Sequence, residues 1–166
     1  MSDAIEIRLG VSSDEGAVRQ CALEAYQRYV ADIGKPPAPM QADFRVQLEG
    51  GSIRVAVDNA GIVVGYVSFA IKNDTAYLDS VAVINHAQGR GIGRLLIETC
   101  EGIARSECAN RIELYTNTVM SENLSLYPYL GYTELSRRQQ DGFDRVYFEK
   151  NIEYTSGDGK WNAVKT

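Results

Sequence analysis

Three glycines alternate with other residues directly before a strongly helical stretch, in the run Gln88, Gly89, Arg90, Gly91, Ile92, Gly93 and Arg94. Glycine lets the backbone turn tightly and come close to a ligand. The first N–H groups of a helix attract anions, because they lack partners inside the helix and lie at the positive end of its dipole. The two arginines add positive charge. The run therefore predicts a cradle for a pyrophosphate, and the alternative is a tight strand-to-helix turn that binds nothing.

Two other phosphate-binding motifs do not fit this run. A dinucleotide-binding fold needs G-x-G-x-x-G after its first strand and an acidic residue about twenty positions later. Here the third glycine comes too early, and the strands before the run read as an antiparallel meander. A Walker loop needs G-K-(S/T), which the run lacks.

The elements around the run predict an α/β fold with a mixed sheet. Apolar and polar patterning predicts strands at residues 5–11, 52–58, 62–71, 76–83, 111–116, 133–138 and 145–151, the last two joined by a loop at 139–142. Helices are expected between 12 and 34, at 41–48, 92–105 and 122–130. Strand 76–83, the helix that follows and strand 111–116 form a parallel βαβ unit joined to the meander, with helices on both faces. Residues 1–152 are expected to form a single domain and residues 153–166 a polar tail.

Composition excludes several classes of partner. The 166 residues carry a formal net charge of −5 without a basic stripe, so nucleic acid is not expected. A single His argues against a His-rich site, and no metal is expected. Three cysteines without a C-x-x-C pair, together with the lack of a signal-peptide pattern, favour a cytoplasmic location. The apolar runs are much shorter than the roughly 18 residues of a membrane span.

Two segments carry a family resemblance. One reads V-A-V-x-x-x-x-Q-G-R-G-I-G-R-L-L and contains the motif (R/Q)-x-x-G-x-(G/A), and the other reads L-Y-P-Y-L-G-Y. Together they resemble the GNAT superfamily of acyl-CoA-dependent N-acyltransferases. The resemblance implies acetyl-CoA or a related acyl-CoA as cofactor, with its pyrophosphate on the backbone of Gln88–Arg94. It also implies that the pantetheine arm pairs with the backbone of Val81 and Val83, where an N–H would stabilise the oxyanion.

The resemblance also suggests three side chains for the site. Tyr127 stands four residues before Gly131, where the superfamily has the tyrosine that protonates the departing thiolate; an ordinary core tyrosine is the alternative. Asp79 shares a strand face with Val81 and Val83, so it is a candidate base or a solvated structural carboxylate. Many members have a cofactor-contacting Asn seven residues before the tyrosine. Met120 stands there, and Asn123 is the substitute candidate.

These features favour an N-acetyltransferase that moves an acetyl group from acetyl-CoA to a primary amine by direct attack. Tyrosines in the first helix and the proline-rich segment 35–39 favour a small-molecule acceptor. The alternatives are an acetyltransferase for protein amines, a non-catalytic acyl-CoA-binding module and a plain interaction domain. The resemblance also allows a homodimer.

Overall fold

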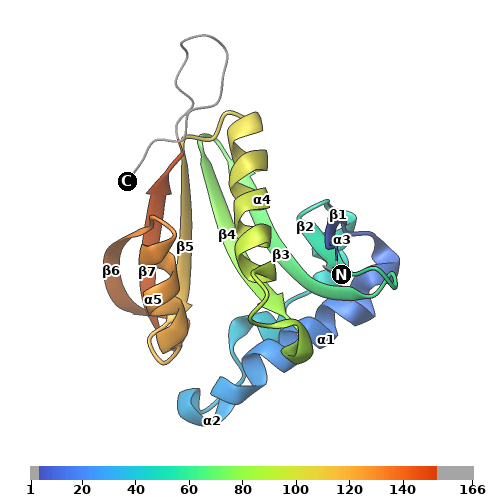
Figure 1. Cartoon of the computed structure of the whole chain (residues 1–166). Helices are drawn as coiled ribbons and strands as arrows, with labels where there is room; N and C mark the ends of the chain where they lie inside the picture. The colour runs from blue at the N-terminus through green and yellow to red at the C-terminus, as the bar shows by residue number, and fades with distance from the viewer. Residues whose placement is uncertain (1–3, 153–166) are drawn as a thin grey trace. The chain divides into compact units, whose positions relative to one another are not determined.

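Within residues 4–152, which the computed structural model describes, seven strands form one sheet in the order β1-β2-β3-β4-β5-β7-β6 (Figure 1). The strands are β1 (Glu6–Leu9), β2 (Ile53–Val57), β3 (Val63–Lys72), β4 (Thr75–Val83), β5 (Arg111–Asn117), β6 (Thr133–Gln140) and β7 (Phe143–Asn151). The helices are α1 (Glu15–Tyr26), α2 (Val30–Ile33), α3 (Phe44–Glu49), α4 (Ile92–Ser106) and α5 (Ser121–Tyr129). Short 3-10 turns occupy Ser12–Asp14, Gln27–Tyr29, Ala38–Gln41 and Asn85–Ala87.

The sheet is mixed, as the sequence predicts. Strand β4 pairs with β5 in parallel through Thr75–Leu78 and Arg111–Leu114, and α4 connects the two strands. The β1–β2, β2–β3, β5–β7 and β6–β7 pairs are antiparallel. Helices lie on both faces of the sheet (Figure 1). The predicted fold class and its βαβ unit are confirmed.

The chain divides into two compact units, each with its own apolar core. The first unit comprises Met1–Phe69 and Asp79–Cys100, and the second comprises Ala70–Leu78 and Glu101–Thr166. Buried side chains of the first unit include Val18, Phe44, Val55, Tyr66 and Leu96. Those of the second include Ile112, Leu114, Tyr127, Val146 and Phe148. The single domain over residues 1–152 stays a prediction, and the tail at 153–166 lies outside the described residues.

Helix α3 begins later than the sequence pattern suggests. It was expected at 41–48, but α3 starts at Phe44 because Asp43 caps it: Asp43 Oδ1 accepts the Val46 N–H at 3.2 Å. The residues before Asp43 form the 3-10 turn Ala38–Gln41 instead. A side-chain cap that satisfies a first-turn N–H fixes the helix start more strongly than apolar spacing does.

The final hairpin is longer than expected. The loop predicted at 139–142 is reduced to Asp141 and Gly142, with φ of 54° and 79°. Two successive left-handed residues, Asp then Gly, make the two-residue turn that best matches strand twist. Strands β6 and β7 therefore stay paired as far as Gln140 and Phe143.

Candidate functional site

The second half of β4 presents an open backbone edge in the first unit. The register with β5 covers Thr75–Leu78 and Arg111–Leu114 and ends there. On the other edge, the Ile84 N–H donates to a β3 carbonyl at 2.9 Å. Successive residues of a strand direct their backbone groups to opposite edges, so those of Val81 and Val83 point away from β3. This is the edge that the resemblance assigns to the pantetheine arm.

Two side chains of the same unit already bond the carbonyls of this edge. The Tyr26 hydroxyl donates to the Val81 carbonyl at 2.8 Å, and Gln88 Nε2 donates to the Val83 carbonyl at 3.0 Å. The pairing of β4 with β5 ends at Leu78, so it does not include the N–H groups of Val81 and Val83. The edge therefore presents mainly donors, which suit carbonyl oxygens of a ligand and an oxygen that gains negative charge.

The three glycines of the run have two different structural roles. Gly89 and Gly91 both have φ of 78°, a left-handed conformation that side chains with a Cβ rarely adopt. Apart from the adjacent residues of the chain, no atom of residues 4–152 lies within 4 Å of the position where a Cβ on either residue would stand. Gly93 instead lies inside α4, and a Cβ there would stand 3.9 Å from Val83 Cγ2. The backbone conformation of the turn thus favours glycine at positions 89 and 91. Gly93 has no such requirement, and its lack of a side chain only leaves space beside Val83.

The start of α4 supplies the expected donors for an anion. The Leu95 N–H donates to the Gly91 carbonyl at 3.0 Å and closes the first helical turn. The N–H groups of the three residues between them therefore have no acceptor inside the helix. Arg90 and Arg94 are exposed beside them, and Arg94 Nε also donates to Glu98 at 2.8 Å. The geometry fits the predicted pyrophosphate cradle.

Side chains of helix α1 and of the 3-10 turn that follows it form hydrogen bonds with the loop between β4 and α4. Glu24 Oε1 accepts the Asn85 N–H at 3.0 Å, and Arg28 Nη2 donates to Gln88 Oε1 at 3.1 Å. The hydrogen bond from Asn85, followed by one from Gln20, lowers the pKa of Glu24 below its usual range. Together with Tyr26, these contacts fix the end of β4 and the entry into the glycine-rich run.

Asp79 lies on β4 in the first unit and is exposed. Gln47 Nε2 of α3 lies 3.5 Å from Asp79 Oδ2, at the outer limit of a hydrogen bond. The other end of the same amide accepts a hydrogen bond from the Ser68 hydroxyl at 2.8 Å. A carboxylate on the strand that carries Val81 and Val83 can receive a proton through water.

Tyr127 lies on α5 in the second unit and is only 4% exposed. Its ring packs against Tyr132 and Phe148, with centroids 5.8 and 5.6 Å away. Within the described residues no group forms a hydrogen bond with its hydroxyl, and burial raises its pKa. The phenol therefore remains protonated at neutral pH, which is the state that a hydrogen-bond or proton donor needs.

Asn123 lies one turn before Tyr127 on α5. Its Nδ2 donates to Thr116 Oγ1 at 3.1 Å and lies 3.7 Å from Met120 Sδ. These contacts direct the amide N–H groups toward the start of the helix. The structure thus brings together Tyr127 and Asn123 in the second unit, and Asp79, Val81, Val83 and the glycine-rich run in the first.

The sequence profile of the acetyltransferase (GNAT) family matches residues 18–132, which is more than half of the chain. The matched range includes β4, the glycine-rich run and α5. The chain belongs to the GNAT acetyltransferase family. No curated protein sequence matches this GNAT chain.

Solved structures of other acetyltransferases share the fold at low sequence identity. PaiA N-acetyltransferase from Thermoplasma acidophilum, in complex with coenzyme A, is 19% identical with a TM-score of 0.73, over 89% of this chain and 99% of that one. The ribosomal-protein-S18-alanine N-acetyltransferase from Escherichia coli is 18% identical with a TM-score of 0.74, over 96% and 100%. YncA from Salmonella typhimurium, with its cofactor acetyl-CoA, is 19% identical with a TM-score of 0.69, over 95% and 99%.

Two expectations about partners concern features outside this site. In residues 4–152, no helix combines the length and apolar character needed to cross a bilayer. The same residues hold no group of three or more His, Cys, Asp or Glu side chains arranged to bind a metal ion.

Sequence reasoning missed the side chains that bond the β4 carbonyls and brace the turn. Tyr26 lies 55 positions before Val81, and Arg28 lies 60 before Gln88. The sequence placed Tyr26 in the first helix, among the tyrosines expected beside the acceptor, and did not indicate a hydrogen bond to Val81. The one sequence signal for these contacts was that three polar residues stand together at the end of the first helix: Glu24, Tyr26 and Arg28. Such a group could have been expected to bond backbone groups of a neighbouring loop.

Proposed function

We propose that this protein transfers an acetyl group from acetyl-CoA to a primary amine, and that the acceptor is a small molecule. The observation that carries the proposal is the donor edge at Val81 and Val83, which leads directly into the glycine-rich turn. The residues present fit an acyl-CoA, because the first N–H groups of α4, which have no acceptor inside the helix, lie beside two left-handed glycines.

Bound acetyl-CoA would supply an acetyl group activated as a thioester. In this proposal the run Gln88–Arg94 holds its pyrophosphate, and Asn123 adds a contact through its amide oxygen. The Val81 N–H would position the pantetheine arm, and the Val83 N–H would be the donor that stabilises negative charge on the thioester oxygen. Each of these groups binds or orients, and none changes its protonation state.

Two side chains handle protons. Asp79 accepts the proton that the attacking amine loses, through water. Tyr127 would donate a hydrogen bond from its hydroxyl group to the departing sulfur. Because burial raises the pKa of Tyr127 further above the value of about 8.5 for a thiol, this hydrogen bond would stabilise the thiolate, which can then take its proton from water.

The test measures release of free CoA thiol with a broad panel of amines, in the wild type and in Tyr127→Phe. We expect thiol release only with a suitable amine, and at least about tenfold slower turnover in the variant. Stability should be unchanged, because the lost hydroxyl has no hydrogen-bond partner in the described residues. Tyr129→Phe, an exposed tyrosine on the same helix, is the matched control. Because the pKa of Tyr127 is raised, its titration should cause no loss of rate up to about pH 10.

Each alternative has a distinct result. A peptide acetylated much faster than every small amine would favour a protein acceptor, as the name of the ribosomal-protein-S18-alanine N-acetyltransferase illustrates. Thermal stabilisation by CoA without turnover on any amine would favour a non-catalytic binding module. Unchanged turnover in Tyr127→Phe would remove Tyr127 from the site.

A further inference from the structure

Two arginines face each other on the final hairpin of the second unit. Arg138 on β6 and Arg145 on β7 are direct cross-strand partners, so their side chains share one face of the sheet. Like charges placed opposite each other on neighbouring strands destabilise the pair. A fold that keeps this arrangement needs a source of negative charge at that point. We call these two residues the guanidinium pair.

The protein supplies little of that negative charge. Arg145 is 6% exposed, and its nearest carboxylate is that of Asp141, 3.5 Å away and itself 74% exposed. Arginine has five N–H donors, yet within residues 4–152 no group accepts a hydrogen bond of normal length from the Arg145 guanidinium. Arg138 has no carboxylate partner among the same residues. Among the described residues the only fully buried side-chain nitrogen or oxygen without a hydrogen-bond partner is Arg105 Nε, so the unfilled donors of Arg145 reach the surface, where an anion can bind them.

An aromatic ring lies against each of the two guanidinium groups. Arg145 stacks 4.0 Å from the Tyr115 ring centroid, and Arg138 stacks 4.0 Å from that of Tyr147. The two tyrosine rings are themselves neighbours, with centroids 5.8 Å apart. A stacked guanidinium uses its flat face for the ring and keeps its N–H edge directed outward. That edge is the part that binds a carboxylate or phosphate through two parallel hydrogen bonds.

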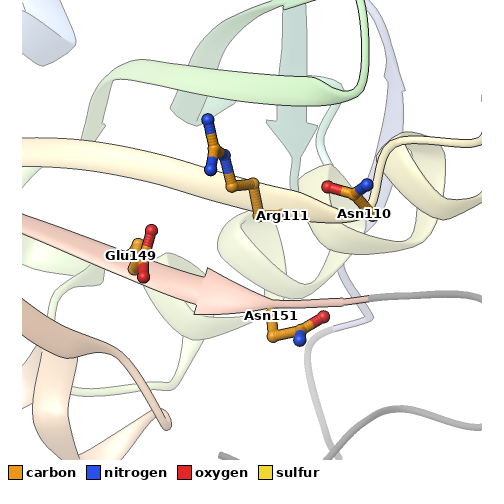
Figure 2. A pocket seen from close by; sticks show the side chains of 4 residues that line it. All are labelled: Asn110, Arg111, Glu149 and Asn151. Atoms are coloured by element: carbon orange, nitrogen blue, oxygen red, sulfur yellow. The ribbon is translucent and has the colours of Figure 1, made fainter.

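A pocket at the far end of the same strands lacks these properties. It lies at the opposite ends of β5 and β7 and is lined by Asn110, Arg111, Glu149 and Asn151 (Figure 2). There Arg111 Nε donates to Thr75 Oγ1 at 3.0 Å and lies 3.8 Å from a Glu113 oxygen. This pocket has a single guanidinium, and its Nε already bonds Thr75, whereas two guanidinium groups meet across β6 and β7, so the guanidinium pair is the stronger anion site.

We propose that the guanidinium pair binds an anionic oxyacid group, a carboxylate or phosphate, carried by the acceptor amine. Tyr127 packs against Phe148, whereas the pair and its rings lie on the face of Tyr147, its neighbour in the strand. Adjacent strand residues point to opposite faces. Tyr127 and the guanidinium pair therefore lie on opposite faces of β7, so an anion bound by the pair does not occupy the face against which Tyr127 packs. Assigning the anion to the acceptor rests on the function proposed above, whereas the anion site itself does not.

The kinetic test compares paired acceptors. Amino acids and ω-amino acids of increasing chain length are each paired with their carboxamides, and phosphoethanolamine is paired with ethanolamine to separate phosphate from carboxylate. The anionic member of each pair should have kcat/KM at least about tenfold higher, because one hydrogen bond to a charged group changes an equilibrium by about that factor. Arg138→Gln should abolish that preference by raising KM, while the rate with the uncharged member stays unchanged. Equal use of both members of every pair would overturn the proposal.

A matched control lies one residue away. Arg137 pairs across the strands with Val146, so it points to the other face, and its guanidinium bonds to Glu134 Oε1 at 3.0 Å. Arg137→Gln removes the same charge from the same strand and should keep the preference. Arg145 is buried and its truncation would also disturb folding, so the exposed Arg138 carries the test. An equal loss in both variants would show a general charge effect and refute the site.

A binding measurement separates this inference from the proposed function. Acetate and inorganic phosphate are titrated into the full chain while the arginine Nε–H signals are followed by NMR. A saturable shift that Arg138→Gln abolishes and Arg137→Gln retains would establish the anion site, even if no amine releases CoA thiol. That combination would leave the site intact and refute acetyl transfer. The lack of a saturable shift with either anion would overturn the site.

Discussion

The two left-handed glycines of the cradle allow a prediction that separates backbone conformation from steric fit. Gly91→Ala introduces a Cβ that, among residues 4–152, would meet no atom within 4 Å beyond its chain neighbours, so its cost comes from φ. At φ of 78° that cost is about 1–2 kcal/mol. For a chain of this size, it corresponds to a fall in Tm of about 2–8 °C.

The effect on cofactor binding should be larger than the effect on folding. The turn can relieve its strain by rotating Gly91 toward negative φ, which turns the N–H groups at the start of α4 away from the anion. The loss of one or two hydrogen bonds to a charged group weakens CoA binding at least about tenfold. Isothermal titration calorimetry with CoA measures this directly, alongside Tm from differential scanning calorimetry.

Gly93→Ala is the matched control. Gly93 has an ordinary helical conformation, and its new Cβ would stand 3.9 Å from Val83 Cγ2, a normal van der Waals distance. Alanine is the better helix former by up to about 1 kcal/mol, so this variant should be at least as stable as the wild type and should keep CoA affinity within about threefold. If Gly91→Ala bound CoA like the wild type, or if both variants lost affinity equally, the conformational argument would be wrong.

Two further predictions concern parts of the chain outside the cradle. Asp14 accepts hydrogen bonds from Arg8 at 2.8 and 3.0 Å and from the Val11 N–H, contacts that lower its pKa, so its contribution to stability is present above about pH 4 and is lost as pH falls through the lowered value. Asp14→Asn should lower the free energy of unfolding, measured with urea, by about 1–2 kcal/mol at pH 7, and the difference from the wild type should shrink steadily as the pH falls below about 4; a difference that does not change with pH would contradict the ion pair. Cys108 is exposed whereas Cys21 and Cys100 are buried, and burial raises the pKa of Cys21 to about 12. The native protein should therefore react promptly with one equivalent of a thiol reagent and with three after denaturation; rapid reaction of all three thiols would show that these helices open readily.

The sequence was sufficient for the parts of the site that depend on local backbone geometry. Glycines beside a strong helical period mark a strand-to-helix turn, and Gly89 and Gly91 do adopt the conformation that only glycine favours. Apolar and polar alternation located every strand of the sheet within a few residues. The misplaced boundaries were those set by single polar groups: the Asp43 cap at α3 and the Asp141–Gly142 turn in the hairpin.

Long-range side-chain contacts could not be predicted in the same way. Nothing in the spacing of Tyr26 distinguishes a packing residue from one whose hydroxyl bonds Val81, because the contact depends on where α1 lies against β4. The same holds for Arg138 and Arg137, which look equivalent in the sequence. The register of β6 against β7 assigns them to opposite faces, one to Arg145 and the other to Val146.

The side chains that bond the β4 carbonyls also bear on what this edge admits. An unpaired strand edge with alternating donors and acceptors is a template for another strand, and proteins block such edges to avoid unwanted pairing. At Val81 and Val83 the acceptors are engaged by Tyr26 and Gln88, whereas the N–H groups stay outside the register with β5. An added peptide strand needs both kinds of group in register and would have to share or displace these hydrogen bonds. A ligand that offers mainly carbonyl oxygens can bond the two N–H groups without displacing these hydrogen bonds. The hydrogen bonds from Tyr26 and Gln88 therefore make the edge selective for such a ligand over an added peptide strand.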